Sequence, residues 1–442
     1  MVGSETVPAS TKPEHYMPLD LSSEVAVRWN DCDAKFVPLL KEGGITTVLL
    51  ASRNEIFETA CREAGLKVRA LEEIQFFSLE SINRASPKAL VALTEGLWPG
   101  VGPPAMDSEQ AFTAGATGRP WVNANAHWFG ILQCLYPNRI ALLGYLPDEK
   151  AGVKPDVLVP RESLEVALAE AWANGGNYLL TLEPYYHDKL LGGDAKALEA
   201  WRQMGRTVQW LIKNASLFRQ PVFPIITVLV EPDDAVAEII NLLYRQNASP
   251  ALVAAADPPA PDALHRRALV AVGIQPPSAA VRRRILSHAE VGTSLIVDAQ
   301  GESAWWRDPR LKRVRSQEDR DFYSLGRGQV VAYHEVIADP GEFAFDVIDI
   351  VTQKRRAVRL WNAPTVIALL TSAPQGRARA LVRLINYGKP EDNILVAVQG
   401  SYTRVSLLQP SAAPVSLPTT QVGSTTEITI PRLGRVGALM LS

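Results

Sequence analysis

The sequence has little of several features that would point directly to a function. Cysteine occurs only as Cys32, Cys61 and Cys134 in 442 residues, which makes neither a disulfide framework nor a spaced metal site. No apolar run approaches the roughly 18 residues that a membrane-spanning helix needs. Basic and acidic residues number 45 and 47, for a formal net charge of −2. Charge therefore gives no argument for binding nucleic acid or an anionic membrane.

Motifs of several enzyme classes are missing as well. The sequence contains no G-x-x-x-x-G-K-[ST] phosphate loop and no G-x-S-x-G nucleophile elbow. His187 has no second histidine at metal-ligand spacing, so we expect neither a metal nor an organic cofactor. The polar stretch from Ser4 to Pro18 is no signal peptide. Because Met1 to Ser4 could replace a removed leader, a secreted, periplasmic or cytoplasmic location stays open.

What is present is an alternation of short apolar runs with amphipathic stretches over residues 1–220. Hydrophobic residues make up 47% and charged residues 21% of the chain, a globular composition long enough for two or three domains. The alternation is typical of βα units and predicts a TIM-type (β/α) barrel, either truncated or with one strand outside the pattern. The predicted strands are Val25–Trp29, Thr46–Ala51, Lys67–Leu71, Leu90–Thr94, Trp121–Asn123, Ile140–Leu146 and Tyr178–Leu182.

Two further patterns follow the barrel. Residues 221–325 alternate apolar runs such as Ile225–Val230 with helical stretches such as Ser278–Glu290, which predicts a flavodoxin-like, doubly wound α/β domain. Residues 326–442 carry Gly and Pro between alternating runs such as Arg379–Asn386. This region is therefore expected to form an antiparallel β-sandwich.

Two glutamates stand where a barrel would carry its chemistry. Catalytic groups of (β/α) barrels lie at the carboxyl ends of strands. Glu95 ends the fourth predicted strand and Glu183 ends the seventh. Retaining glycosidases use two carboxyl groups about 5–5.5 Å apart, so Glu183 is the candidate nucleophile and Glu95 the candidate acid/base. The alternative is that each glutamate caps a loop or pairs with an arginine.

Aromatic and polar residues gather near the same strand ends. Aromatic rings can stack on the C–H faces of sugars, and polar side chains can bind sugar hydroxyls. Each could equally pack in the core or satisfy loop backbone. The candidate substrate-binding residues are Asp31, Trp98, Asn123, Asn125, His127, Trp128, Tyr185 and Tyr186, with Asp148 as a further carboxylate.

Four segments carry a resemblance to a known layout: Phe36–Ile45, Glu170–Gly176, His288–Val297 and Arg383–Tyr387. They are similar to parts of glycoside hydrolases in which a barrel precedes a class I glutamine-amidotransferase-like domain and a β-sandwich. Beta-galactosidases with a trimerisation domain have this general layout. The sequence departs from it in two ways. Thr94 precedes Glu95 where the family has asparagine, and the middle region has no cysteine to act as the amidotransferase nucleophile.

The resemblance implies a glycoside hydrolase that acts on an O-glycosidic bond of an oligo- or polysaccharide. A function of another class stays open beside it: a catalytically silent barrel that binds saccharide or a protein partner, or a scaffold whose middle domain mediates homo-oligomerisation. The positions of the Glu95 and Glu183 carboxyl groups discriminate between hydrolysis and binding.

Overall fold

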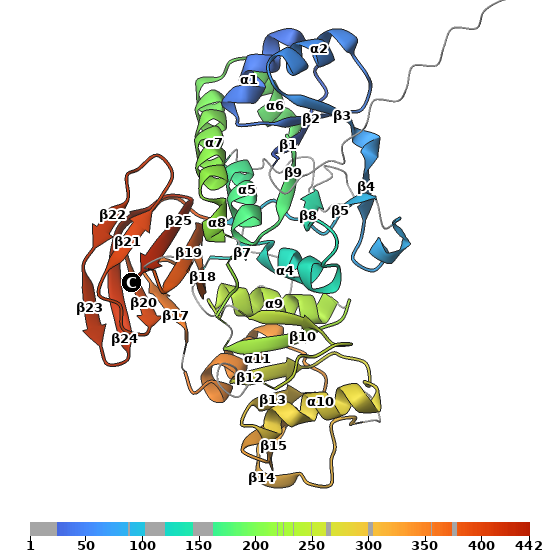
Figure 1. Cartoon of the computed structure of the whole chain (residues 1–442), viewed down its shortest axis with the longest axis vertical. Helices are drawn as coiled ribbons and strands as arrows, with labels where there is room; N and C mark the ends of the chain where they lie inside the picture. Colours follow the sequence, from blue (N-terminus) through green and yellow to red (C-terminus); the bar gives the residue numbers. More distant parts are fainter. Residues whose placement is uncertain are drawn as a thin grey trace, which may run out of the picture.

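The computed structural model arranges the chain in three parts, each built on its own β-sheets. Figure 1 shows the N-terminal part in blue to green, the middle part in yellow-green to orange below it, and the C-terminal part in red at one side. The structure describes residues 24–86, 89–101, 120–144, 162–218, 220–223, 225–232, 234–248, 250–261, 267–298, 304–354, 356–373 and 378–442. Asp148, one of the candidate carboxylates, lies outside these ranges.

The N-terminal part is built on one sheet of seven parallel strands in the order β3-β2-β1-β9-β8-β5-β4. This is the sequential order of a (β/α) barrel, with β3 and β4 as the two ends of the described sheet. The strands are β1 (Ala26–Arg28), β2 (Thr47–Leu50), β3 (Lys67–Ala70), β4 (Ile74–Phe77), β5 (Leu90–Leu93), β8 (Leu142–Gly144) and β9 (Asn177–Thr181).

The sheet curls around a small apolar interior. Six of the seven strands contribute to its wall, and side chains of β1, β2, β4, β5, β8 and β9 form one cluster that includes Ala26, Ile74 and Leu179. Strand side chains alternate between faces, so Arg28, two residues after Ala26, also points inward. Its guanidinium lies 6.0 Å from the ring centre of Phe76 on β4. Because β1 and β4 are far apart in strand order, this contact requires barrel-like curvature and confirms the predicted fold class.

Two predicted features of the barrel need correction. Trp121–Asn123 does not supply a barrel strand, because β7 (Val122–Asn123) pairs only with β6 (Gly100–Val101) in a separate two-stranded antiparallel sheet. The sheet instead contains β4, which follows β3 after the single 3-10 turn Leu71–Glu73. That turn leaves no room for the intervening helix on which the βα pattern depends.

Helices cover the outer face of the curled sheet. Helix α7 closes this layer against α1, where Gly205 lies so close to the first helix that a Cβ there would sit 2.1 Å from the Glu42 carbonyl oxygen. The Trp201 indole N–H donates to the Leu39 carbonyl at 2.7 Å in the same contact. The helices are α1 (Val37–Glu42), α2 (Glu55–Glu63), α4 (Ala126–Leu135), α5 (Ser163–Ala173), α6 (Pro184–Leu191), α7 (Ala195–Lys213) and α8 (Ala215–Phe218).

The middle part is a mixed sheet in the order β11-β10-β12-β13-β16-β15-β14, with its first five strands parallel. The parallel strand β16 extends this sheet beyond residue 325, where the sequence pattern ends the middle domain. Helix α9 packs against α4 of the barrel part. The elements are β10 (Ile226–Val230), α9 (Asp234–Arg245), β11 (Ala251–Ala254), β12 (Ala268–Ala271), α10 (Ala279–Glu290), β13 (Ser294–Val297), β14 (Lys312–Ser316), β15 (Arg320–Leu325), β16 (Gly328–Tyr333) and α11 (Pro340–Asp346).

The C-terminal part is a sandwich of two antiparallel sheets, β17-β20-β24-β23 and β18-β19-β25-β21-β22. Alternating Val, Leu and Ile side chains from both sheets form its core, which is why the period-two pattern predicts it correctly. The strands are β17 (Val358–Trp361), β18 (Val366–Ser372), β19 (Ala380–Asn386), β20 (Glu391–Gln399), β21 (Val405–Leu408), β22 (Val415–Leu417), β23 (Thr419–Val422), β24 (Thr425–Leu433) and β25 (Val436–Leu441).

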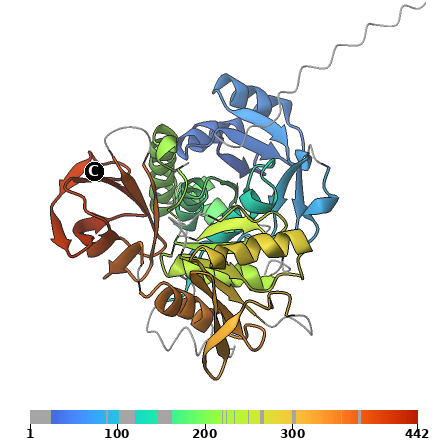
Figure 2. The ribbon, with the colours of Figure 1, turned by 60° about the horizontal axis from the view of Figure 1, so that its bottom comes forward.

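The three parts share contacts that hold them together. Figures 1 and 2 both show the sandwich beside the green helices of the barrel part. Arg383 on β19 donates to the carbonyl oxygens of Ala173 and Gln220, and burial lowers its pKa to about 10. The Asn247 side chain, after α9, accepts the Ala368 N–H at 2.6 Å. One continuous cluster of buried apolar side chains includes residues from all three parts.

Candidate functional site

Glu183 lies at the carboxyl end of β9, where it begins helix α6. Its two carboxylate oxygens accept the backbone N–H groups of Tyr185 at 3.0 Å and Tyr186 at 2.9 Å, so it is the N-cap of this helix. Each oxygen keeps a second lone pair, and the side chain is half-buried. Glu183 therefore has a fixed carboxylate that can still accept a further proton or hydrogen bond.

Glu95 follows β5 at the same edge of the sheet. Its carboxylate accepts the Leu79 N–H at 2.7 Å and the Thr94 hydroxyl at 3.3 Å. Leu79 follows β4, so Glu95 ties together the ends of two neighbouring strands. The side chain is half-buried, as that of Glu183 is.

The spacing of the two glutamates follows from strand order. β5 and β9 both pair with β8, from opposite sides. Neighbouring strands lie about 4.8 Å apart, so the carboxyl ends of β5 and β9 are about 10 Å apart. The Leu79 contact also draws the Glu95 side chain toward β4, away from β9. The arrangement favours widely separated carboxyl groups over the close pair of a retaining enzyme.

Among the aromatic candidates, Tyr185 alone has a largely exposed side chain, at 54%. Trp98 and Trp128 are buried in the main apolar cluster, and their role as sugar platforms stays a prediction. Tyr186 is also buried, and its hydroxyl donates to the Ala197 carbonyl at 3.1 Å. In this set, the exposed ring of Tyr185 is the one most readily available to stack on a sugar.

Two of the polar candidates are buried in the structure. The Asn125 side chain accepts the Leu97 N–H at 2.7 Å and donates to the Leu97 carbonyl at 3.0 Å, so it braces a loop. His127 is buried in helix α4, and burial lowers its pKa to about 3. Both residues lie in the interior of the described structure, and their role in substrate binding stays a prediction.

Two further candidates keep some exposure but have local partners. Asn123 accepts the Trp121 indole N–H at 3.0 Å. Asp31, after β1, accepts the Asp33 N–H at 3.0 Å, the pattern of a local turn. Both side chains are half-buried. Their carboxylate and amide groups remain reachable from solvent, and their role in binding stays a prediction.

Glu170 is a buried carboxyl group that the sequence pattern does not single out. It lies inside α5 at 0% exposure and accepts hydrogen bonds from the Tyr387 hydroxyl at 2.5 Å and from the N–H groups of Asn125 and Ala126. Burial raises its pKa to about 7, and these hydrogen bonds oppose the shift. Glu170 thus joins the barrel part to the sandwich. The available signal is an acidic residue inside an otherwise apolar helical run.

The inner face of the sheet carries a second polar feature close to Glu183. Arg28 and Thr181 lie opposite each other on the paired strands β1 and β9. Arg28 comes two residues after Ala26, and Thr181 comes two residues after Leu179. Since Ala26 and Leu179 belong to the interior cluster and side chains alternate along a strand, Arg28 and Thr181 also point inward. Two donors, one from an arginine and one from a threonine, therefore stand side by side just below the strand end that carries Glu183.

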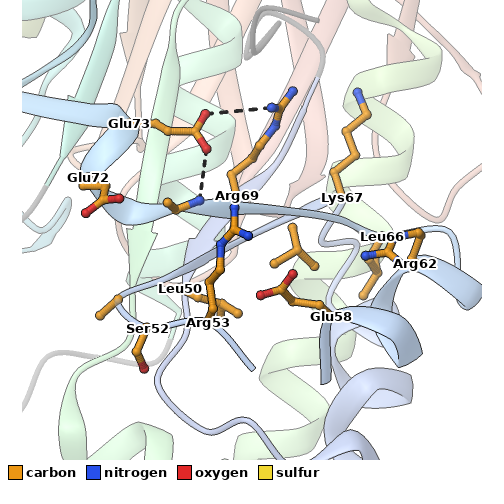
Figure 3. Close-up of a pocket in the computed structure, with 13 residues that line it drawn as sticks. Leu50, Ser52, Arg53, Glu58, Arg62, Leu66, Lys67, Arg69, Glu72 and Glu73 are labelled. Atoms are coloured by element: carbon orange, nitrogen blue, oxygen red, sulfur yellow. Dashed lines mark hydrogen bonds and ion pairs between the residues drawn. The ribbon is translucent and has the colours of Figure 1, made fainter. Parts of the chain in front are cut away.

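A pocket of about 930 Å³ follows the outer edge of β3 (Figure 3). Residues 66–70 all line it, and because successive side chains alternate between faces, the pocket runs along the edge of the strand. Arg69 and Glu73 form an ion pair at 3.9 Å in its wall. Its lining comes from β2, α2, β3 and the turn after β3, and includes none of the predicted site residues.

In the part of the chain that the structure describes, no group of three or more His, Cys, Asp or Glu side chains is placed to hold a metal ion. No described helix combines the length and the apolar character that a bilayer crossing demands.

No protein-family model and no curated protein sequence matches this chain. Among solved structures, it is similar to alpha-L-fucosidase isoenzyme 2 from Paenibacillus thiaminolyticus, with 10% identity, coverage of 95% of this chain and 99% of that chain, and a TM-score of 0.56. It is also similar to a GH42 beta-galactosidase from G. stearothermophilus, with 10% identity, coverage of 88% and 66%, and a TM-score of 0.49. The fucosidase match covers both chains almost completely, so the two proteins share a fold. The chain therefore has the fold of this fucosidase.

Proposed function

We propose that this protein hydrolyses an O-glycosidic bond of an oligo- or polysaccharide, with Glu95 as the proton donor and Glu183 as the second carboxylate. One observation carries the proposal. Both glutamates follow strands of the curled sheet at its carboxyl edge, where barrels carry their catalytic groups. Tyr185, next to Glu183 and exposed, supplies a ring on which a sugar can stack.

The strand spacing supports a single displacement. The strand ends are about 10 Å apart, too far for the close carboxyl pair of a retaining enzyme. Inverting glycosidases hold their carboxyl groups about 6.5–9.5 Å apart to leave room for a water molecule, so in the proposed mechanism the Glu95 side chain turns from the Leu79 N–H toward β9 when substrate binds. Glu95 gives its proton to the leaving oxygen as the bond from the anomeric carbon to that oxygen breaks. Glu183 takes a proton from the water that attacks the anomeric carbon on the opposite face. The two N–H donors of α6 keep the Glu183 carboxylate in position.

The test is turnover of an aryl glycoside panel by wild-type protein and by Glu95→Gln and Glu183→Gln. Loss of a general acid or base costs about 10²- to 10⁴-fold in rate, so both variants should lose activity to this extent. Glu199→Gln, an exposed glutamate on α7, is the matched control and should keep full activity. Proton NMR of the first-formed product should show inversion at the anomeric carbon. Unchanged rates in the Glu183→Gln variant would reject the assignment.

A second candidate function is saccharide binding without hydrolysis. It is favoured because each carboxylate already accepts backbone hydrogen bonds: Glu183 caps helix α6, and Glu95 accepts the Leu79 N–H. In that case the glycoside panel shows no turnover, while calorimetry with the same sugars still shows binding. The middle α/β part contains no cysteine, so we assign it a supporting role and no thiol-based amidotransferase chemistry.

A further inference from the structure

Arg28 and Thr181 form an adjacent pair of buried donors on the inner face of the sheet. The register of β1 with β9 places the two residues opposite each other, about 4.8 Å apart along the hydrogen-bonding direction. Glu183 follows Thr181 by two residues, so the pair lies directly below the proposed catalytic carboxylate. Arg28 as a whole residue is half-buried, and the Nη1 atom of its guanidinium is buried.

Both donors lack a hydrogen-bond partner in the described structure. The Nη1 atom of Arg28 and the Oγ1 atom of Thr181 are buried and make no hydrogen bond there. Buried polar groups in folded proteins are nearly always paired, and an unpaired pair at the carboxyl edge of a barrel marks a place where a ligand can complete the bonding. The Phe76 ring, 6.0 Å from the guanidinium, attracts the cation but accepts no conventional hydrogen bond.

Among the described residues, no acidic side chain compensates the charge of Arg28. Burial alone lowers the pKa of Arg28, with no contribution from an acidic side chain. Glu183, the acidic residue that follows on the neighbouring strand, has its carboxylate directed to the N–H groups of Tyr185 and Tyr186. A guanidinium without a carboxylate partner is suited to an anionic ligand.

We infer that Arg28 and Thr181 bind the carboxylate of a uronic acid, so that the substrate is an acidic saccharide. The guanidinium fork matches a planar carboxylate with two parallel hydrogen bonds, and the Thr181 hydroxyl supplies a third donor. A sugar anchored in this way would lie next to Glu183. This inference rests on the proposed function for its substrate class, but the binding step can be tested without any turnover.

The experiment is isothermal titration calorimetry with matched pairs of sugars: galacturonic acid against galactose, and glucuronic acid against glucose. One charge-assisted contact is worth about 10- to 100-fold in affinity, so wild-type protein should prefer the acid of at least one pair by that factor. Arg28→Met should abolish the preference, Arg28→Lys should keep part of it, and Thr181→Val should weaken binding of the acid about 3- to 10-fold. Equal affinity for acid and neutral sugar in both pairs overturns the inference.

Two controls keep the result specific. Thr227 on β10 is also buried with an unpartnered hydroxyl, so Thr227→Val should leave binding unchanged. Arg28→Met removes an unpaired buried charge and should not lower the melting temperature; a large decrease would make Arg28 a structural residue and overturn the assignment. Sodium sulfate binding as tight as the uronate would mean a general anion site and would also overturn it.

The two proposals fail in different ways. Binding of uronic acids without hydrolysis of any glycoside contradicts the proposed function and supports the inference. Hydrolysis of neutral glycosides by a protein with no preference for acids contradicts the inference alone.

Discussion

Replacing Tyr387 with phenylalanine tests whether the buried Glu170 carboxyl stabilises the contact between the barrel part and the sandwich. The Tyr387 hydroxyl donates to the fully buried Glu170 carboxyl at 2.5 Å. Burial raises the pKa of Glu170 from an ordinary 4.5 to about 7 in the folded protein. That difference corresponds to about 3 kcal/mol of folding free energy, linked to the protonation of one side chain.

The sign of the pH dependence follows from the raised pKa. The folded protein holds the proton more tightly than the unfolded chain, so this contribution is full below about pH 4.5 and is lost as the pH rises through about 7. Tyr387→Phe removes a donor that favours the ionised carboxylate, and this raises the folded-state pKa further. We expect the variant to lose about 1 kcal/mol of unfolding free energy at pH 5 and about 2–3 kcal/mol at pH 8.5.

The assay is urea unfolding followed by tryptophan fluorescence at the two pH values. Tyr186→Phe is the matched control, because this tyrosine is also buried but donates to the neutral carbonyl of Ala197. It should lose about 1 kcal/mol at both pH values. The reasoning is refuted if Tyr387→Phe is destabilised equally at pH 5 and pH 8.5, or no more than the control at pH 8.5.

Two further expectations concern packing and thiol chemistry. Gly205→Ala would place a Cβ 2.1 Å from the Glu42 carbonyl oxygen, so it should cost about 3 kcal/mol in thermal unfolding. Gly434→Ala, with no atom within 4 Å of its new Cβ, should have little effect, and similar losses in both variants would contradict the packing argument. Iodoacetamide at pH 8 should modify the half-buried Cys32 before Cys61, which is fully buried and whose pKa is raised by burial to about 11. Peptide mass mapping that finds Cys61 modified first would contradict this.

Strand positions were predictable where the chain alternates regularly. β1, β2, β5, β8 and β9 each overlap a predicted run, because buried parallel strands are short and largely apolar segments. β3 also coincides with its predicted run, although its sequence Lys-Val-Arg-Ala is polar and only partly buried. β4 was not predictable in this way, since no helix separates it from β3. The pairing of β7 with β6 depends on a contact between distant segments, which the local pattern of Trp121–Asn123 does not contain.

The candidate site was less predictable, because burial decides which polar residues are available. The sequence places Asn125 and His127 directly after a predicted strand, where polar side chains are expected to face solvent. In the structure both side chains lie in the interior. Their surroundings come from far along the chain. Glu170, which receives the Asn125 N–H, is 45 residues away in sequence, and Tyr387 lies 217 residues from Glu170. Long-range partners of this kind leave no periodic signal in a single sequence.

The apolar cluster that runs through all three parts has a practical consequence for dissecting this protein. Phe218 and Leu217 of the barrel part, Val228 of the middle sheet and Ile385 of the sandwich belong to the same cluster. Cutting the chain near residue 220 would expose this apolar surface to solvent on both fragments, and each fragment would tend to aggregate. The barrel part, the middle part and the sandwich therefore do not behave as independent modules. Exchanging any one of them for another domain would require redesign of the surfaces that it contacts on the other two.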